Sequence, residues 1–248
     1  MKEQATEVRK TRDGSFLTLP MNSWYGGSQF DHLFELRDFP IPSKWDVEIF
    51  EPQGLRGAVP LSEEQILRGL RDPIGAESLT EMASGRSDAV IIVDDLSRPT
   101  PAFAVLPHIL DELAAGGLRE EDIRIIIGLG THRPLTKAEQ RRKLGRGIVD
   151  RIQVVNHNAF TRQARHYQRS DGGPDFAINR LVGEADLKIS ISGIIPHGGA
   201  GFGGGAKAIL PSVATYDSIM FNHSTYAWEG YGIVYPKRIE SACIRRDM

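Results

Sequence analysis

The 248-residue chain contains a single cysteine, Cys243, which excludes an internal disulfide framework and any metal site built from several cysteines. It also has no excess of basic charge, because its 30 Lys and Arg residues are balanced by 32 Asp and Glu residues. No apolar run approaches the roughly 18 residues of a membrane span, and the polar start MKEQATEVRKTRDG has no apolar core of the secretory type. These absences predict a cytoplasmic protein that binds neither nucleic acid nor membrane.

The composition, 40% hydrophobic and 25% charged, is that of a globular protein large enough for one sizeable core. Residues 1–87 show a mixed pattern, with short candidate strands at Phe16–Leu19 and Trp45–Ile49 and a capping box that opens a helix at Ser78. We expect these residues to be an N-terminal segment that packs on the same domain as the rest of the chain.

From Asp88 onward, apolar runs alternate with amphipathic segments. Thr100 and Pro101 are expected to cap one helix that runs to Gly116, and a capping box at Thr136 opens another that closes near Gly145. The apolar runs read as buried strands at Ala89–Val93, Ile123–Ile127, Ile152–Val155 and Leu187–Ile191. This order predicts an α/β fold, a Rossmann-like three-layer domain with a parallel sheet and an α/β core at 88–235.

Polar clusters follow the predicted strands. They are Asp94–Arg98, Gly128–Pro134, Asn156–Asn158 and a glycine loop after the last strand. Ligands of parallel α/β sheets bind beyond the carboxyl ends of the strands. We therefore expect these loops to form one site, although His157 in the third loop is more compatible with packing.

The glycine loop reads HGGAGFGGGAKAILP and places six glycines between His197 and Lys207. The spacing G-x-G-x-x-G occurs in it, but a run this rich in glycine satisfies many spacings by chance. A Walker loop is excluded because Ala206 and Ala208 flank the lysine. A flexible turn without a ligand is one interpretation; glycine N–H groups beside a lysine favour a phosphate-bearing ligand.

His223 lies sixteen residues after Lys207. In one continuous helix their Cα atoms would stand about 24 Å apart. Pro211 predicts a break in the helix or a helix start, which allows the chain to return and the two residues to share a site.

Taken together, Asp94-Asp-Leu-Ser-Arg98-Pro, Gly130-Thr-His132-Arg, His197, Lys207 and His223 resemble the nickel-dependent lactate racemases, in the order that the family has them. The resemblance runs from about Asp88 to His223 and extends weakly through the N-terminal segment. It implies a nickel-pincer nucleotide, a pyridinium mononucleotide whose sulfur-bearing substituents and ring carbon hold nickel.

The resemblance also implies a role for each matching residue. Lys207 would be joined covalently to the cofactor, His223 would bind nickel, and His132 and His197 would be the catalytic acid/base pair. The cofactor would be bound by Asp95, Gly203, Gly204 and Gly205, and the substrate carboxylate by Arg98. Arg98 is also compatible with simple pairing to Asp94 or Asp95.

The implied reaction is the racemisation or epimerisation of lactate or a related 2-hydroxy acid, which makes the protein an isomerase. The α-hydrogen leaves as hydride to the pyridinium ring while a histidine takes the hydroxyl proton, and two imidazoles suit this work near neutral pH. Cofactor-synthesis proteins are implied as partners. The oligomeric state is left open.

The chain also departs from the family. Members have two domains, so residues 236–248 are expected to begin a connection to a second domain that is absent from this chain. Ser212 stands where glycine is expected after the proline. Two other functions remain open: an α/β module that binds a nucleotide or phosphate ligand without nickel, and an isolated domain of the racemase that is inactive alone.

Overall fold

The structure, a computed structural model, describes residues 7–11, 14–21, 35–48, 59–98, 100–168, 175–197 and 200–226. The chain divides into two compact units, Met1–Glu63 and Glu64–Met248. The expected boundaries near residues 87 and 235 remain predictions, and the expected connection at 236–248 lies outside the described residues.

The first unit contains a three-stranded antiparallel sheet in the order β1-β2-β3. Its strands are β1 (Glu7–Thr11), β2 (Gly14–Met21) and β3 (Glu35–Ile41). The candidate strand at Phe16–Leu19 is confirmed within β2. The one at Trp45–Ile49 is wrong over its described residues, because the chain turns there and the Trp45 N–H donates to the Pro42 carbonyl at 2.9 Å; Ile49 lies outside the described residues.

The second unit is built on a four-stranded parallel sheet in the order β6-β5-β4-β9. The strands are β4 (Ala89–Asp94), β5 (Ile123–Gly128), β6 (Gln153–Asn156) and β9 (Leu187–Ile191). They form because unbroken apolar runs bury both faces of the central strands. The chain proceeds from β4 to β5 and β6 on one side and adds β9 on the other, so the strand order reverses beside β4, where such folds bind ligands.

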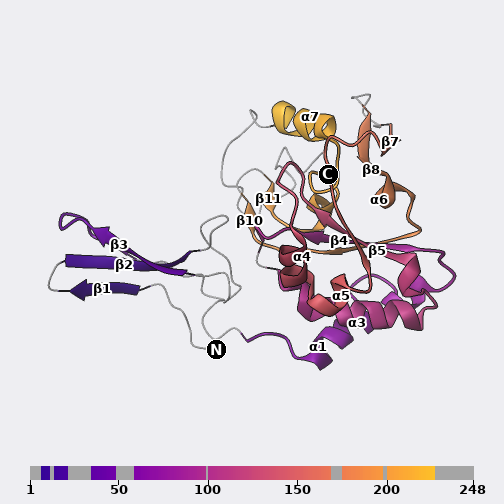
Figure 1. The fold of residues 1–248 in the computed structure, drawn as a ribbon, viewed down its shortest axis with the longest axis horizontal. Coiled ribbons are helices and arrows are strands. Elements are labelled where there is room, and N and C mark those ends of the chain that lie inside the picture. Colours follow the sequence, from indigo (N-terminus) through magenta and orange to yellow (C-terminus); the bar gives the residue numbers. More distant parts are fainter. Residues whose placement is uncertain are drawn as a thin grey trace. The chain divides into compact units, whose positions relative to one another are not determined.

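Helices and short hairpins connect these strands (Figure 1). The helices are α1 (Glu63–Arg71), α2 (Leu79–Ala83), α3 (Ala102–Ala115), α4 (Lys137–Leu144), α5 (Arg146–Val149), α6 (Arg180–Glu184) and α7 (Tyr216–Tyr226), with 3-10 turns η3 (Glu120–Asp122) and η4 (Gly205–Ala208). Two antiparallel hairpins pair β7 (Ala164–Tyr167) with β8 (Phe176–Asn179), and β10 (Pro196–His197) with β11 (Gly201–Phe202).

The capping boxes predicted at Ser78 and Thr136 are present. The side chains of Ser78 and Thr136 accept hydrogen bonds from the N–H groups of Glu81 and Glu139, whose carboxylates bind back to the cap N–H groups. The helix predicted after Thr100 and Pro101 is present as α3, with Pro101 at its N-cap and Gly116 at its C-cap, but no side chain caps its first turn. The Thr100 hydroxyl instead donates to the Asp94 carboxylate at 2.5 Å.

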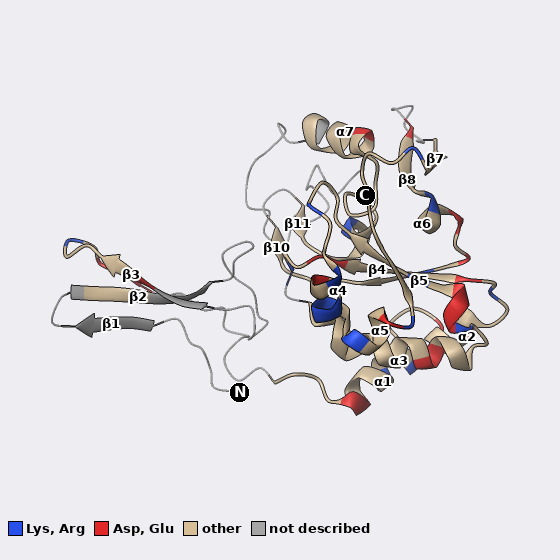
Figure 2. Ribbon diagram, viewed as in Figure 1, with Lys and Arg blue, Asp and Glu red and all other residues tan. Residues whose placement is uncertain are grey.

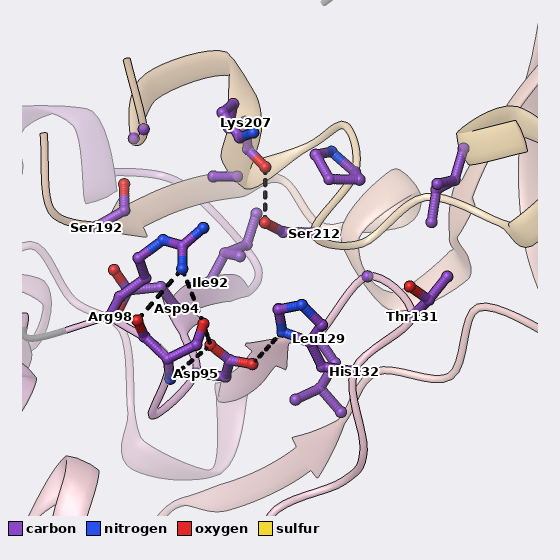
Figure 3. A pocket seen from close by; sticks show the side chains of 18 of the residues that line it. Ile92, Asp94, Asp95, Arg98, Leu129, Thr131, His132, Ser192, Lys207 and Ser212 are labelled. Carbon is purple, nitrogen blue, oxygen red and sulfur yellow. Dashed lines mark hydrogen bonds and ion pairs between the residues drawn. The ribbon is translucent and has the colours of Figure 1, made fainter. Parts of the chain in front are cut away.

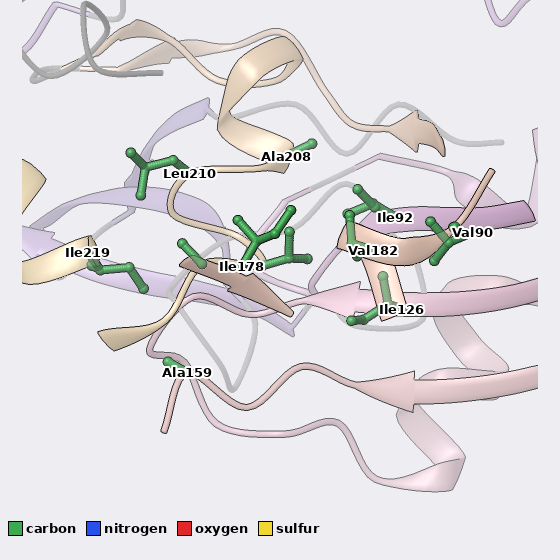
Figure 4. Close-up of a cluster of buried hydrophobic side chains, with 12 residues drawn as sticks. Val90, Ile92, Ile126, Ala159, Ile178, Val182, Ala208, Leu210 and Ile219 are labelled. Carbon is green, nitrogen blue, oxygen red and sulfur yellow. The ribbon is translucent and has the colours of Figure 1, made fainter. Parts of the chain in front are cut away.

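The sheet carries helices on both sides, which confirms the predicted three-layer α/β arrangement (Figure 1). On one side, alternate residues of β4 and β5 pack against α6, β8, η4 and α7 in one apolar cluster (Figure 4). The cluster includes Val90, Ile92, Ile126, Ile178, Val182, Leu210 and Ile219. Among the residues that the structure describes, no helix is long and apolar enough to cross a membrane.

Candidate functional site

A cavity of about 490 Å³ opens at the carboxyl ends of β4, β5 and β9, beside the reversal in strand order. Figure 3 shows Asp95, Arg98 and His132 on the strand side of this pocket and Lys207 across from them. Eight of the nine predicted site residues line it: Asp95, Arg98, His132, His197, Gly203, Gly204, Lys207 and His223. The ninth, Gly205, is exposed and is not among the lining residues.

His132 is oriented by a buried carboxylate. Its Nδ1 lies 2.6 Å from Asp95 Oδ2, and the Ser97 N–H donates to the other carboxylate oxygen at 3.0 Å. Burial alone would raise the pKa of Asp95, but the hydrogen bonds from His132 and Ser97 outweigh it and hold that pKa below its ordinary value. The ionised carboxylate accepts the Nδ1 proton, so neutral His132 presents a basic Nε2.

His197 is held at both ring nitrogens. The Ala200 N–H donates to its Nδ1 at 3.1 Å, and its Nε2 lies 3.0 Å from the Lys207 amine nitrogen. Burial is the largest cause that lowers the pKa of His197 to about 4, and the charge of Arg98 adds to it. The imidazole is therefore neutral at physiological pH.

One ring nitrogen of His223 is engaged by its own helix. Its Nδ1 lies 3.0 Å from the Ile219 carbonyl, which can only accept, so the proton of the neutral ring lies on Nδ1 and the lone pair on Nε2. Burial is the largest cause that lowers the pKa of His223, and it favours the neutral form, in which Nε2 could bind a metal.

The protein offers His223 few companions as metal ligands. Within the described part of the chain, no three His, Cys, Asp or Glu side chains gather in a way that could hold a metal ion. A metal on His223 would therefore take its remaining ligands from a bound molecule, and imidazole is a good ligand for nickel.

The predicted break between Lys207 and His223 is confirmed. Lys207 lies in the 3-10 turn η4, and α7 does not begin until Tyr216, so the chain turns back and both side chains line one cavity. Ser212, the departure from the family pattern, donates its hydroxyl to the Lys207 carbonyl at 2.7 Å. This hydroxyl closes the turn that carries the lysine.

Gly203 and Gly204 let the glycine loop lie close to Gly193, which follows β9. A Cβ atom at either position would lie 3.1 to 3.2 Å from the Gly193 carbonyl oxygen. Gly204 also has φ +70° and ψ −174°, a backbone conformation that is essentially restricted to glycine. The glycines therefore shape the cavity wall by their close contact with Gly193.

Gly204→Ala should lower the free energy of unfolding by about 1–3 kcal/mol, because it combines a glycine-only conformation with a close contact. Gly205→Ala is the matched control, since Gly205 has φ +57° but an added Cβ would meet nothing within 4 Å. Chemical denaturation of both variants measures the difference. Equal losses in the two variants would show that the contact with Gly193 contributes nothing.

Arg98 does not form the simple pairing left open by its sequence. It donates to the carbonyl and hydroxyl of Ser97, at 3.2 and 3.0 Å, and within the described residues it pairs with neither Asp94 nor Asp95. Its guanidinium lines the cavity, where it is placed to take an anionic ligand.

The sequence did not predict the buried ion pair of Lys143 and Asp94, which supports the cavity wall beside Arg98. Lys143 of α4 is fully buried and lies 2.7 Å from Asp94 Oδ1, and its ammonium also donates to the Arg98 carbonyl at 3.0 Å. The other Asp94 oxygen accepts from Thr100 and from the Gly193 N–H at 3.1 Å. The pair thus ties α4 to the loops after β4 and β9.

No sequence signal marks Lys143, because it belongs to the basic last turn of α4, which Figure 2 colours blue. Such a turn normally faces solvent and interacts with the helix dipole. Its neighbour Arg141 does so, and pairs with Asp150 at 3.0 Å on the surface.

The loop after β6 does not reach the cavity, contrary to the expectation that all the strand-end loops would meet there. Asn156 instead binds the N–H and carbonyl of Leu135, at 3.1 and 2.9 Å. His157 is buried, and its Nε2 lies 2.9 Å from the Ala214 carbonyl. The packing interpretation of His157 is therefore the one that the structure supports.

Acid should destabilise the fold through its buried histidines. Burial is the largest cause that lowers the pKa values of both His157 and His197. Unfolded histidine takes up a proton near pH 6.5, whereas these folded rings stay neutral, so the free energy of unfolding should fall as the pH drops from about 6.5 toward 4.

Urea midpoints measured between pH 7.5 and 5 test this expectation, and each fully buried histidine can contribute up to about 1.4 kcal/mol per pH unit. His157→Gln should reduce the slope of stability against pH. His166→Gln is the control, since His166 is exposed and should leave the slope unchanged. A midpoint that is flat from pH 7 to 5 would contradict the role assigned to burial.

Comparisons with known proteins place these residues in context. A family model described as the lactate racemase N-terminal domain matches residues 34–230. The lactate racemase of Thermoanaerobacterium thermosaccharolyticum is 37% identical over 218 residues, 85% of this chain and 49% of that protein. That of Lactiplantibacillus plantarum is 38% identical over 164 residues, 65% of this chain and 38% of that protein. The chain thus spans half or less of the length of these relatives.

Solved structures agree with this assignment. The lactate racemase apoprotein from Thermoanaerobacterium thermosaccharolyticum superposes with a TM-score of 0.68 and 30% identity, covering 93% of this chain and 51% of that one. A protein from Thermotoga maritima has a TM-score of 0.60 and 22% identity, covering 76% and 46%, which supports the fold alone.

Proposed function

The chain belongs to the lactate racemase family, and from this premise we propose that it racemises lactate or a related 2-hydroxy acid with a nickel-pincer nucleotide attached to Lys207. The observation that carries the proposal is the convergence on one cavity of His132, His197, Lys207 and His223, which come from four separate segments. The proposal includes a cytoplasmic location, cofactor-synthesis proteins as partners, and no nucleic acid or membrane partner.

The residues present fit such a cofactor. Lys207 offers a primary amine at the cavity wall, and His223 offers a single imidazole nitrogen whose orientation is fixed by the Ile219 carbonyl. A cofactor that brings its own nickel ligands needs only that one protein ligand. When bound, such a cofactor would supply a pyridinium ring as hydride acceptor and donor for the substrate C2.

The remaining steps belong to this chain's own side chains. His132 presents a basic Nε2 that can take the hydroxyl proton of one enantiomer, with Asp95 stabilising the imidazolium that results. His197 lines another wall of the cavity and would take the hydroxyl proton of the opposite enantiomer. Arg98 would grip the substrate carboxylate through paired N–H donors.

Chiral chromatography tests the proposal on protein produced together with the cofactor-synthesis proteins. We expect interconversion of the two lactate enantiomers, or those of another 2-hydroxy acid. In D₂O the C2 hydrogen should be retained, because it travels as hydride; deuterium incorporation at C2 would contradict the proposed chemistry.

The assay should include the chain alone and the chain fused to the remaining half of the Thermoanaerobacterium thermosaccharolyticum relative. Activity only in the fusion would identify the chain as a domain that is inactive alone. Tight binding of a common nucleotide that is weakened by Lys207→Ala but not by His223→Ala would instead favour a phosphate-binding module without nickel.

A further inference from the structure

His197 and Lys207 contact each other directly, and the contact fixes where their protons lie. A neutral imidazole has one donor nitrogen and one acceptor nitrogen. Nδ1 of His197 accepts the Ala200 N–H at 3.1 Å, so the ring proton lies on Nε2. Nε2 lies 3.0 Å from the Lys207 amine nitrogen, within reach to donate that proton to it. An ammonium group has no acceptor, so the arrangement requires Lys207 to be a neutral amine.

The surroundings favour the same state. Lys207 is 9% exposed, which disfavours its charged form. The Arg98 cation lowers the pKa of His197 and lines the same cavity as Lys207, where a second positive charge on Lys207 would be unfavourable. The two carboxylates of the adjacent loop are already engaged, Asp94 by Lys143 and Asp95 by His132.

We propose that His197 holds Lys207 as a neutral amine in the cofactor-free protein and thereby prepares it as the nucleophile for cofactor attachment. The identity of the electrophile, a thiocarboxylate, rests on the proposed function. An ammonium lysine cannot attack, and a neutral lysine in a desolvated pocket can.

The attachment balances without an oxidant or a reductant. The amine lone pair forms a C–N bond at the thiocarboxylic acid carbon, and the C–O bond of that carbon breaks. The oxygen leaves as water with one proton from the amine and one from the acid, and the product is a thioamide. The thioamide nitrogen has no basic lone pair, so the hydrogen bond from His197 Nε2 to the Lys207 nitrogen is lost on attachment.

Competitive acetylation of the cofactor-free protein with trace acetic anhydride at pH 7 tests the proposal, with peptide masses reporting each lysine. An ordinary lysine is only about 0.04% neutral at this pH. Lys207 should therefore react at least about tenfold faster than exposed Lys137, while ion-paired Lys143 should react more slowly than either. His197→Phe, which removes the ring nitrogens, should bring Lys207 down to the rate of Lys137.

Equal labelling of Lys207 and Lys137 in the wild-type protein, or unchanged labelling of Lys207 in His197→Phe, would overturn the proposal. Nitrogen-15 NMR of wild-type His197 gives a second reading that does not depend on a variant. A proton on Nε2 supports the proposal, and a proton on Nδ1 overturns it. Because no cofactor enters either experiment, their failure is separate from any failure of the proposed racemase activity.

Discussion

Lys143→Met should lower the free energy of unfolding by about 3–5 kcal/mol, because it leaves the Asp94 carboxylate buried without its cation. The Lys143 ammonium is fully buried, and it bridges Asp94 at 2.7 Å and the Arg98 carbonyl at 3.0 Å. Denaturant titration of the cofactor-free protein measures the loss. A methionine fills most of the lysine stem's volume, so the cost reports the missing charge rather than a cavity.

Two controls separate this effect from a general sensitivity of α4. Lys137→Met removes an exposed lysine from the same helix and should change stability by no more than about 0.5 kcal/mol. Adding Asp94→Asn to Lys143→Met removes the uncompensated charge and should recover part of the loss. A Lys143→Met variant as stable as wild type would show that the pair does not support the cavity wall.

His132→Gln should lower kcat by about 10²–10⁴-fold in the cofactor-loaded protein, because a general acid/base group contributes rate on that scale. The racemisation equilibrium constant is one, so kcat/KM must fall equally for both enantiomers. KM should change little, since the substrate carboxylate is assigned to Arg98. Asp95→Asn should act in the same direction, because the amide no longer holds the proton on Nδ1 of His132.

His166→Gln is the matched control for this experiment, since His166 is exposed and does not line the cavity. The assay must also show that the His132→Gln protein carries the cofactor, by its mass. A loaded His132→Gln protein that retains wild-type kcat would remove His132 from the catalytic pair.

The sequence predicted the sheet and the location of the site. Ala89–Val93 and Ile123–Ile127 are apolar runs too short for helices, and they form the central strands β4 and β5. Because parallel strands bring their carboxyl ends to one edge, the sequence placed together the residues that follow β4, β5 and β9, although the loop after β6 lies elsewhere. The capping boxes predicted the starts of α2 and α4, because a capping box depends only on residues three positions apart.

Contacts between distant segments could not be predicted in this way. The burial of Lys143 depends on where α4 docks, and its own helix pattern reads as a solvated turn. The tautomer of His132 depends on Asp95, which lies 37 residues away in the sequence. Thr100 is a further example, because its hydroxyl donates to the Asp94 carboxylate, whereas the local pattern predicts that it caps α3.

The central claim is that Lys207 carries the cofactor, and the most direct test is the mass of the peptide that contains Lys207. The protein should be produced together with the cofactor-synthesis proteins and digested without exposure to strong nucleophiles. We predict an added mass on Lys207 that matches a pyridinium mononucleotide joined through a thioamide. An unmodified Lys207 under these conditions would contradict the account.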